Sequence, residues 1–208
     1  MYLPPKFENT DKKQIFSFMQ AHPFALLAGV DDAGLPVATQ APIFTEGNAQ
    51  EFTLYGHISK HTDHYAAFEK NRNVLVVFSH PGSYISASWY PNAQVASTWN
   101  YIAVQVHGEL QFTSKQKLRE ILEKTTMHFE KNKQSAALVS NMSEDYLDAS
   151  MNEIAGFSIV VKEVKALFKL SQNKSDVVQQ TIREHLEKGD AEAQFIARQM
   201  DARKKCPI

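Results

Sequence analysis

Residues 86–110, SASWYPNAQVASTWNYIAVQVHGEL, join a loop rich in aromatic residues to a long strand pattern. Over residues 101–112 the side chains alternate, with Ile102, Val104 and Val106 on one face and Gln105 and His107 on the other. This period of two predicts a long, half-buried strand. Because strands of this kind pair with neighbours, the remainder of the chain should supply further strands.

The loop before this strand holds both tryptophans of the chain, Trp89 and Trp99, with Tyr90 and Asn100 beside them. Such an aromatic cluster covers one end of a core or contacts another subunit, since Trp and Tyr favour half-wet positions. It can equally form a wall for a planar ligand, with Asn100 as both donor and acceptor. The residue types leave these alternatives open.

Elements on both sides of this stretch complete the predicted fold. Strands are expected at 23–30, 37–44, 51–57, 73–80, 156–164 and 166–170, and helices at 9–22, 62–71, 113–131, 175–188 and 190–203. Thr113 and Gln116 match a capping box for the third of these helices. Short hairpin-like spacing predicts an α+β, mainly β fold, an antiparallel barrel with peripheral and C-terminal helices. We expect a single domain over residues 1–208, with 175–203 as a helical extension.

Composition limits the possible functions. The 208 residues are 43% hydrophobic, and 22 Lys and Arg against 23 Asp and Glu give a net charge of −1. This balance gives no global attraction to nucleic acid. The single cysteine, Cys206, excludes an intramolecular disulfide. The start of the chain lacks a signal-peptide pattern and no apolar run could span a membrane, so a cytoplasmic protein is expected.

The segment YGHISKHTDHY (residues 55–65) concentrates polar side chains where a predicted strand meets a predicted helix. Its hydroxyls, its lysine and the backbone N–H groups of a helix start suit an anionic phosphate. Its histidines are also competent metal ligands, although their spacing matches no specific zinc pattern. The third alternative is a polar helix cap with solvated histidines.

A second polar run, ALFKLSQNKSD (residues 166–176), follows an apolar strand directly. Asn173 or Ser175 is expected to cap the next helix, and Lys169, Ser171 and Gln172 could meet an anion or the edge of a ring. The chain contains no GxSxG, HExxH, GxGxxG or GxxxxGK[ST] motif. No catalytic set can be identified from the sequence.

Five segments, MYLPPKFENTD, YGHISKH, SYISASWY, TWNYIAVQVHGEL and FKLSQNKS, resemble in the same order the PaiB-type negative transcriptional regulator family. The resemblance covers nearly the whole chain. It implies an FMN-binding split barrel related in fold to the pyridoxamine phosphate oxidases. Lys60 stands where the family commonly has arginine, which keeps the charge but loses the bidentate fork.

The resemblance also implies a homodimer with FMN in a groove between the subunits and no metal. It places His57, Ser59, Lys60 and Thr62 at the phosphate, and Trp99 and Asn100 at the isoalloxazine. Thr39 and Gln40 would pass the ring, and Lys169 and Gln172 complete the implied cofactor contacts.

Two functions from different classes remain open. The family name implies a regulator of gene expression, with DNA or a regulatory protein as partner, although no helix-turn-helix pattern is present. The alternative is an FMN-dependent oxidoreductase or flavin reductase with a reduced nicotinamide as donor, in which the flavin supplies the chemistry. A haem-binding split barrel is a third, weaker interpretation, based on the eight histidines.

Overall fold

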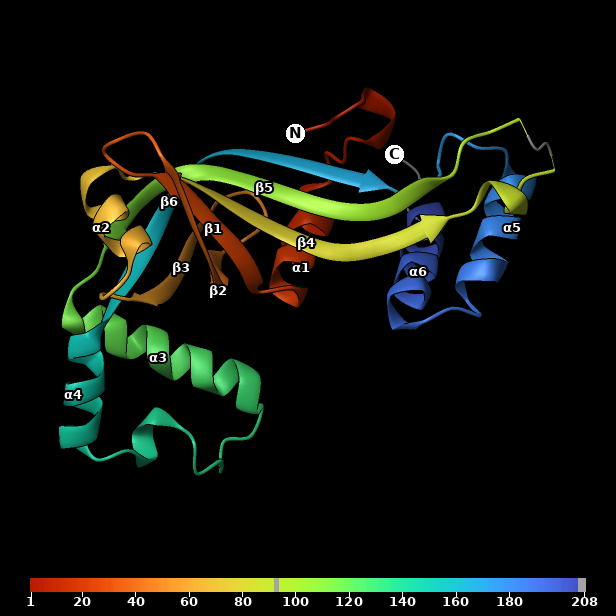
Figure 1. Cartoon of the computed structure of the whole chain (residues 1–208). Helices are drawn as coiled ribbons and strands as arrows, with labels where there is room; N and C mark the ends of the chain where they lie inside the picture. The colour runs from red at the N-terminus through yellow and green to blue at the C-terminus, as the bar shows by residue number, and fades with distance from the viewer. Residues whose placement is uncertain (92–93, 206–208) are drawn as a thin grey trace. The chain divides into compact units, whose positions relative to one another are not determined.

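The computed structural model describes residues 1–91 and 94–205 (Figure 1). Cys206 lies outside the described residues. The strands are β1 Phe24–Val30, β2 Pro36–Gly47, β3 Phe52–Ser59, β4 Asn73–Ile85, β5 Thr98–Phe112 and β6 Ile154–Lys169. The helices are α1 Lys12–Ala21, α2 Asp63–Lys70, α3 Lys115–Glu130, α4 Glu144–Glu153, α5 Asp176–Leu186 and α6 Ala191–Lys205, with 3₁₀ turns at Pro5–Phe7, Ala87–Trp89 and Val139–Asn141.

These elements form two compact units. The barrel unit comprises Lys12–Phe78 and Gln105–Val164, and the terminal unit comprises Met1–Asp11, Ser79–Val104 and the chain from Lys165 onward. The later parts of β4 and β6 and the first part of β5 belong to the terminal unit. The expected single domain, with its helical extension, stays a prediction.

The six strands close into a barrel in the order β1-β2-β3-β6-β5-β4. Neighbouring strands are antiparallel, and Leu27 of β1 lies opposite Thr39 of β2 and Val76 of β4. Alternate side chains such as Leu27, Ile43, Leu54 and Val76 are completely buried, as a filled small barrel requires. The predicted α+β, mainly β fold with an antiparallel barrel and peripheral helices is confirmed.

The turn between β1 and β2 shows how local sequence fixes the hairpin. The carboxylate of Asp31 accepts hydrogen bonds from the backbone N–H groups of Ala33 and Leu35, at 2.9 and 2.8 Å. Gly34 has φ of +80°, a conformation that glycine adopts without strain. The DDAGLP segment therefore makes the turn that its residues predict.

Helices α3 and α4 share a small apolar cluster with the turn at Val139–Asn141. Leu118, Val139, Leu147 and Met151 are buried in it. Helix α4 was not predicted from the sequence, and the predicted cap of α3 is wrong: the N-cap is Ser114, whose hydroxyl accepts from the N–H of Lys117. A backbone hydrogen bond from Thr113 to the carbonyl of Gly156, at 2.8 Å, keeps Thr113 in the sheet, so the helix begins one residue later.

The terminal unit contains the end of β6 and the α5–α6 pair. Ile182 and Leu186 of α5 and Ile196 and Met200 of α6 are buried, so the two predicted C-terminal helices are present. The two strands expected at 156–164 and 166–170 are a single strand, β6. Glu8 forms an isolated antiparallel β-bridge with Leu167, near the end of β6. This bridge attaches the N-terminal segment to β6.

Candidate functional site

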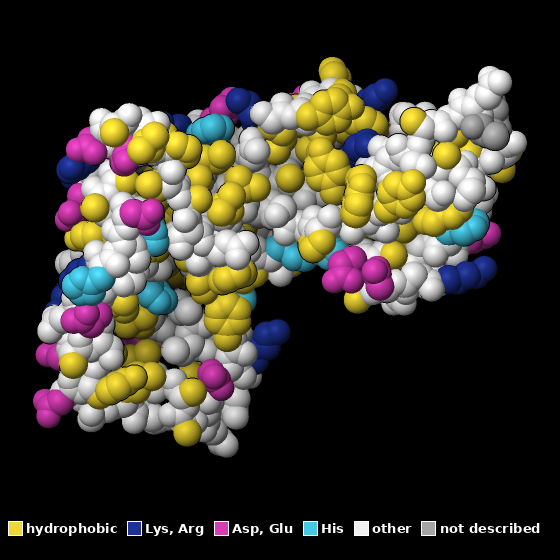
Figure 2. All heavy atoms as spheres, viewed as in Figure 1, with side chains coloured by type: hydrophobic (Ala, Val, Ile, Leu, Met, Phe, Trp, Pro, Cys, Tyr) yellow, Lys and Arg dark blue, Asp and Glu magenta, His cyan; other side chains and the backbone are white. Residues whose placement is uncertain are grey.

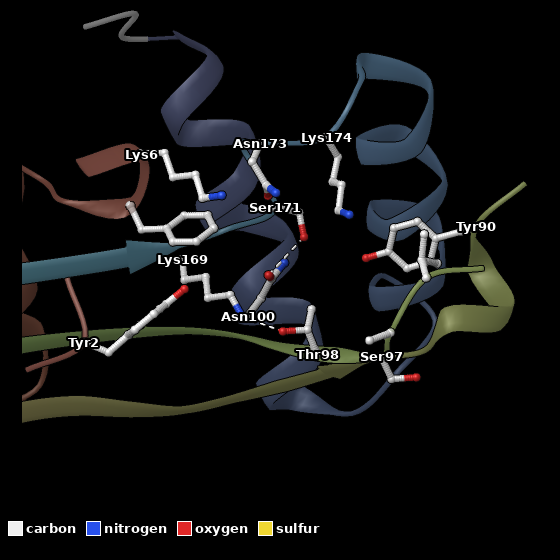
Figure 3. Close-up of a pocket in the computed structure, with 13 residues that line it drawn as sticks. Tyr2, Lys6, Tyr90, Ser97, Thr98, Asn100, Lys169, Ser171, Asn173 and Lys174 are labelled. Carbon is white, nitrogen blue, oxygen red and sulfur yellow. Dashed lines mark hydrogen bonds between the residues drawn. The ribbon is translucent and has the colours of Figure 1, made fainter. Parts of the chain in front are cut away.

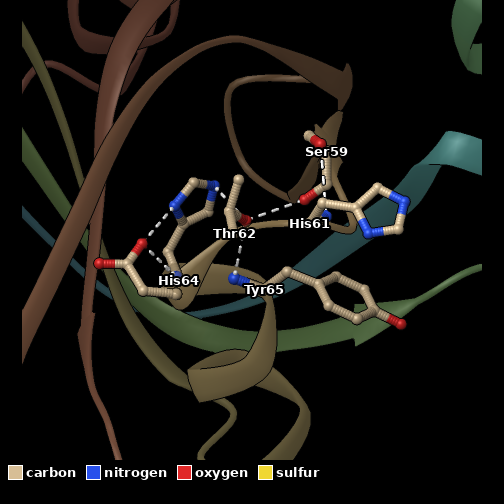
Figure 4. A network of polar contacts seen from close by, with 6 residues as sticks. Ser59, His61, Thr62, His64 and Tyr65 are labelled. Carbon is tan, nitrogen blue, oxygen red and sulfur yellow. Dashed lines mark hydrogen bonds and ion pairs between the residues drawn. The ribbon is translucent and has the colours of Figure 1, made fainter.

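The β3–α2 loop (residues 59–62) is organised by the hydroxyl of Thr62 (Figure 4). This hydroxyl donates to the carbonyl oxygen of Ser59 at 2.9 Å and accepts from the backbone N–H of Tyr65 at 3.3 Å. Thr62 is therefore the N-cap of α2, which agrees with the helix-cap interpretation of this segment. The cap fixes the backbone of the loop whether or not the loop binds a ligand.

The C-terminal end of α4 holds the same loop through three contacts. The backbone N–H of Lys60 donates to the carbonyl of Glu153, and its ammonium donates to the carbonyl of Asn152, both at 2.9 Å. The Nε2 atom of His61 lies 2.9 Å from the carboxylate of Glu153. Among the described residues Asn152 is the recorded acceptor for the Lys60 ammonium, so its other N–H bonds are available to an anion.

The histidines of this segment do not form a metal site within the described part of the chain. His57 alternates along β3 with the buried Gly56 and Ile58, and burial lowers its pKa, which favours the neutral ring. The Nδ1 atom of His57 is buried and has no partner among the described residues. His64 is buried, and its Nδ1 atom lies 3.2 Å from Oδ1 of Asp63. Across residues 1–91 and 94–205, no three His, Cys, Asp or Glu side chains gather as metal ligands.

Thr39 and Gln40 lie on β2, opposite Leu27 and Leu26 of β1. Thr39 is half-buried and Gln40 is exposed, because successive side chains of a strand point to opposite faces. The structure thus places the implied phosphate residues and this strand pair in the barrel unit. It places Trp99, Asn100, Lys169 and Gln172 in the terminal unit.

A pocket of about 380 Å³ lies within the terminal unit, and we call it the lysine pocket (Figure 3). It is built from three parts of the chain: the N-terminal segment, the stretch that leads into and begins β5, and the residues at and after the end of β6. Its lining consists of Tyr2, Lys6, Phe7, Tyr90, Val95, Ala96, Ser97, Thr98, Asn100, Lys169, Ser171, Asn173 and Lys174. Four of the five segments that carry the family resemblance contribute to this lining, although they are far apart in the sequence.

The three lysines of the pocket are held close to neutral groups. The ammonium of Lys169 donates to the hydroxyl of Thr98 at 2.5 Å. The ammonium of Lys174 lies 5.0 Å from the ring centroid of Tyr90, and that of Lys6 lies 5.3 Å from the ring of Phe7. Burial, and to a smaller extent the charge of Lys174, lowers the pKa of Lys169.

Two of the expected ligand contacts, Asn100 and Gln172, also have partners within the terminal unit. The completely buried Asn100 accepts a hydrogen bond from the hydroxyl of Ser171 at 3.0 Å. The amide of Gln172 donates to the carbonyl of Phe168 at 2.6 Å and accepts from the N–H of Leu170 at 2.7 Å. These bonds brace the turn that follows β6, where Ser171 has φ of +60°.

The two tryptophans have different surroundings. Trp89 stacks on His185 of α5, with ring centroids 4.7 Å apart. It therefore packs against the C-terminal part of this helix. Trp99 is 52% exposed and meets the half-exposed Tyr84 edge to face. The core-cover interpretation therefore describes Trp89, and Trp99 remains accessible to a ligand or a second chain.

The sequence prediction missed Lys6 and Tyr90 as members of the lysine pocket. The run at residues 166–176 did carry a signal, because its lysines and hydroxyls suggested an anion site. Nothing in the local pattern of Lys6 or Tyr90 indicates that they join that run.

Comparisons with known proteins give a consistent result. A family model described as "Putative FMN-binding domain" matches residues 1–163. "Protease synthase and sporulation protein PAI 2" from Bacillus subtilis is 32% identical over 187 residues, which is 90% of this chain and 89% of that protein. These matches confirm the resemblance stated from the sequence segments.

Two solved structures share the fold. The FAD and heme binding protein from Mycobacterium smegmatis aligns with a TM-score of 0.60 and 15% identity, covering 78% of this chain and 73% of that one. The flavocytochrome Anf3 from Azotobacter vinelandii aligns with a TM-score of 0.56 and 17% identity, covering 78% and 69%. Within the described residues, no helix combines the length and apolar character needed to cross a membrane.

Proposed function

Because this chain belongs to the "Putative FMN-binding domain" family, we propose that its β3–α2 loop holds the phosphate of the flavin. The chain is an FMN-binding split-barrel protein that resembles PaiB-type regulators. The proposal depends chiefly on one observation: the loop presents the partly free ammonium of Lys60, and Ser59, the preceding residue, is exposed. A phosphate accepts hydrogen bonds from such donors, so this donor set fits FMN.

The individual roles in the loop differ. Lys60 would supply the positive charge and Ser59 a hydroxyl donor, whereas Thr62 would fix the loop through its cap. His57 would contribute hydrogen bonding and no charge, since burial favours its neutral form. The carboxylate of Glu153 is paired with His61, which reduces its repulsion of an incoming phosphate.

The proposed ring contacts are Trp99, Asn100, Thr39 and Gln40. The exposed indole of Trp99 supports such a contact, since aromatic faces stack on planar ligands. Asn100 would act through its bond to Ser171. The resemblance implies a flavin groove between two chains, so the phosphate and ring contacts need not come from one chain.

Lys169 and Gln172 complete the proposed set. Both have partners inside the terminal unit. The main role of Gln172 would be to support the turn after β6. When bound, FMN can accept and pass on electrons, and the protein would supply binding and orientation.

We also propose a homodimer. On β1, Phe24 and Leu26 are 60% and 38% exposed, while the alternating Ala25 and Leu27 are buried inside the barrel. An exposed apolar strand face of this kind suits a protein–protein contact. Light scattering should give twice the chain mass at micromolar concentration.

We propose a regulatory role from the resemblance to PaiB-type regulators, and the similar Bacillus subtilis protein is named "Protease synthase and sporulation protein PAI 2". Direct DNA binding by this chain should be weak and salt-sensitive, because its net charge is −1. On the face shown in Figure 2, Lys and Arg side chains are scattered and acidic groups lie among them. This mixture of charges gives no support to DNA as a partner, a regulatory protein is proposed from the family resemblance, and a cytoplasmic location stays a prediction.

The absorption spectrum of the purified protein tests the proposal. We expect a yellow protein with one FMN per chain, and colourless protein that fails to take up added FMN would contradict it. Addition of NADH or NADPH then tests the alternative, an FMN-dependent oxidoreductase. Rapid bleaching of the flavin would favour the oxidoreductase, whereas an unreactive flavin would favour the regulator.

A further inference from the structure

The lysine pocket concentrates positive charge without an opposing carboxylate. Lys6, Lys169 and Lys174 line it, and no Asp or Glu is among its described lining residues. None of the three ammonium groups forms an ion pair with a described residue. In contrast, Lys162 and Lys115, in the barrel unit, pair with acidic side chains at 3.0 Å. Charge that is left unbalanced in a cavity is the usual sign of an anionic ligand.

A second, independent feature of the same pocket is the hydroxyl of Tyr90. This oxygen is buried, yet it has no hydrogen-bond partner among the described residues. A buried hydroxyl without a partner destabilises the protein, so it calls for an explanation such as a missing ligand. Figure 3 shows the hydroxyl of Tyr90 pointing toward Lys174 and the interior of the pocket.

The remaining lining limits the kind of ligand. The volume of about 380 Å³ is in the range of small-molecule sites and exceeds the space that one bare phosphate needs. The rings of Tyr2, Phe7 and Tyr90 provide an apolar wall beside the ammonium groups. Such a wall suits the organic part of a small molecule, and the lysines suit its anionic part.

We propose that the lysine pocket binds the phosphoryl group of a small phosphorylated molecule other than the protein's own FMN. Three ammonium groups match a dianion better than a single carboxylate, and lysine binds phosphate as a point charge. The proposal does not depend on flavin binding at the β3–α2 loop. It does change the expected roles of Lys169 and Asn100, which line this pocket and would face the second ligand in place of the flavin.

Inorganic phosphate is the probe for the anionic part of the site. The full-length protein is titrated calorimetrically in low-salt buffer, once saturated with FMN and once saturated with riboflavin. We expect one phosphate per chain in the FMN form, whereas the riboflavin form leaves the proposed phosphate site of the β3–α2 loop open and should bind a second. If phosphate binds only the riboflavin form, it fills the site that the FMN phosphate leaves open, the pocket is not a second phosphate site, and the proposal is wrong. If phosphate does not bind either form saturably, the pocket is not an anion site.

Three variants assign the binding to the pocket. Lys174→Met should weaken phosphate binding by about tenfold to a hundredfold, the range for one hydrogen bond to a charged group. Lys188→Met removes an exposed lysine of the same unit outside the pocket lining, and should leave the affinity within twofold. Equal losses in these two variants would show that phosphate responds only to overall charge, which would overturn the proposal.

Tyr90→Phe gives a readout that a purely structural role would not produce. It removes the buried hydroxyl and leaves the ring against Lys174. The free protein should unfold at the same or a higher temperature, because an unpaired polar atom is gone, while phosphate binding weakens by about tenfold. Unchanged phosphate affinity in folded Tyr90→Phe would remove this hydroxyl from the site and contradict the proposal.

Discussion

Replacement of Lys60 by alanine tests whether the β3–α2 loop holds the FMN phosphate. The ammonium of Lys60 donates one hydrogen bond to the carbonyl of Asn152, which leaves its other N–H bonds for a phosphate oxygen. A hydrogen bond to a charged group contributes about 1.5–3 kcal/mol, and about 1.4 kcal/mol corresponds to a factor of ten. Lys60→Ala should therefore raise the dissociation constant of FMN by about tenfold to a hundredfold.

Riboflavin provides the internal comparison, because it lacks the phosphate and should lose almost no affinity. The backbone bond from Lys60 to Glu153 survives the substitution, so the loop should keep its position. Lys60→Arg retains the charge and offers two parallel donors, and should bind FMN at least as well as the parent. Lys70→Ala, at the other end of α2, removes a lysine that pairs with Asp32 and should change neither affinity.

Fluorescence titration of both flavins against the four proteins measures these differences. An equal loss of FMN and riboflavin affinity in Lys60→Ala would mean that Lys60 supports the fold or the ring. A change below twofold for FMN would mean that Lys60 is a solvated charge at the start of a helix. Either result would refute the phosphate assignment.

Four further substitutions test the structure around the proposed sites. Thr62→Ala should lower the free energy of unfolding by about 0.5–2 kcal/mol through loss of the α2 cap, measured by urea denaturation. Gly82→Ala should lower it by more than about 2 kcal/mol, because φ is +80° and the new Cβ would lie 2.5 Å from the carbonyl of Asn100. Gly34 has the same φ, but no atom lies within 4 Å of its added Cβ. Gly34→Ala should therefore lose less stability, and the difference between the two variants measures the steric contribution at Gly82. Leu26→Asp on the exposed face of β1 should halve the mass seen by light scattering, and an unchanged mass would exclude this face as the dimer contact.

The strands and the main helices could be predicted because their signals are local. Alternation of apolar residues and turn residues such as Gly34 indicate hairpins without knowledge of the partner strand. The signal for α4 was also present: Ser143 caps it, and Leu147 and Met151 stand four residues apart. The polar residues around that helix obscure this signal.

The continuity of β6 could not be read in the same way. Its middle is polar and partly exposed, from Lys162 to Lys165, and it separates two apolar runs. A strand is continuous when its backbone hydrogen bonds are continuous. The pattern of apolar and polar residues in the sequence indicates only which side chains are buried, so it does not show this continuity. The predicted N-cap of α3 was wrong for a related reason. The backbone N–H of Thr113 is bonded to the carbonyl of Gly156 in β6, and the sequence does not show this pairing.

The lysine pocket shows where sequence reasoning about a site ends. Residues 166–176 carry the composition of an anion site, but Lys6 joins them only because the N-terminal segment bridges to β6. The unpaired hydroxyl of Tyr90 is a property of packing, and no pattern of neighbouring residues encodes it. The residue types were therefore predictable, while the charge balance of the cavity was not.

The two interpretations of the β3–α2 loop, a helix cap and a phosphate site, can be assigned to different side chains. The hydroxyl proton of Thr62 is directed to the carbonyl of Ser59, and its oxygen accepts from Tyr65. A hydroxyl in this state has no proton left for a phosphate oxygen, so in the proposed site the donors to the phosphate are Lys60, Ser59, His57 and backbone N–H groups. Thr62→Ala should consequently lower stability while keeping the preference for FMN over riboflavin, and Lys60→Ala should do the reverse. Loss of both stability and FMN preference in Thr62→Ala would show that the cap and the phosphate site cannot be separated.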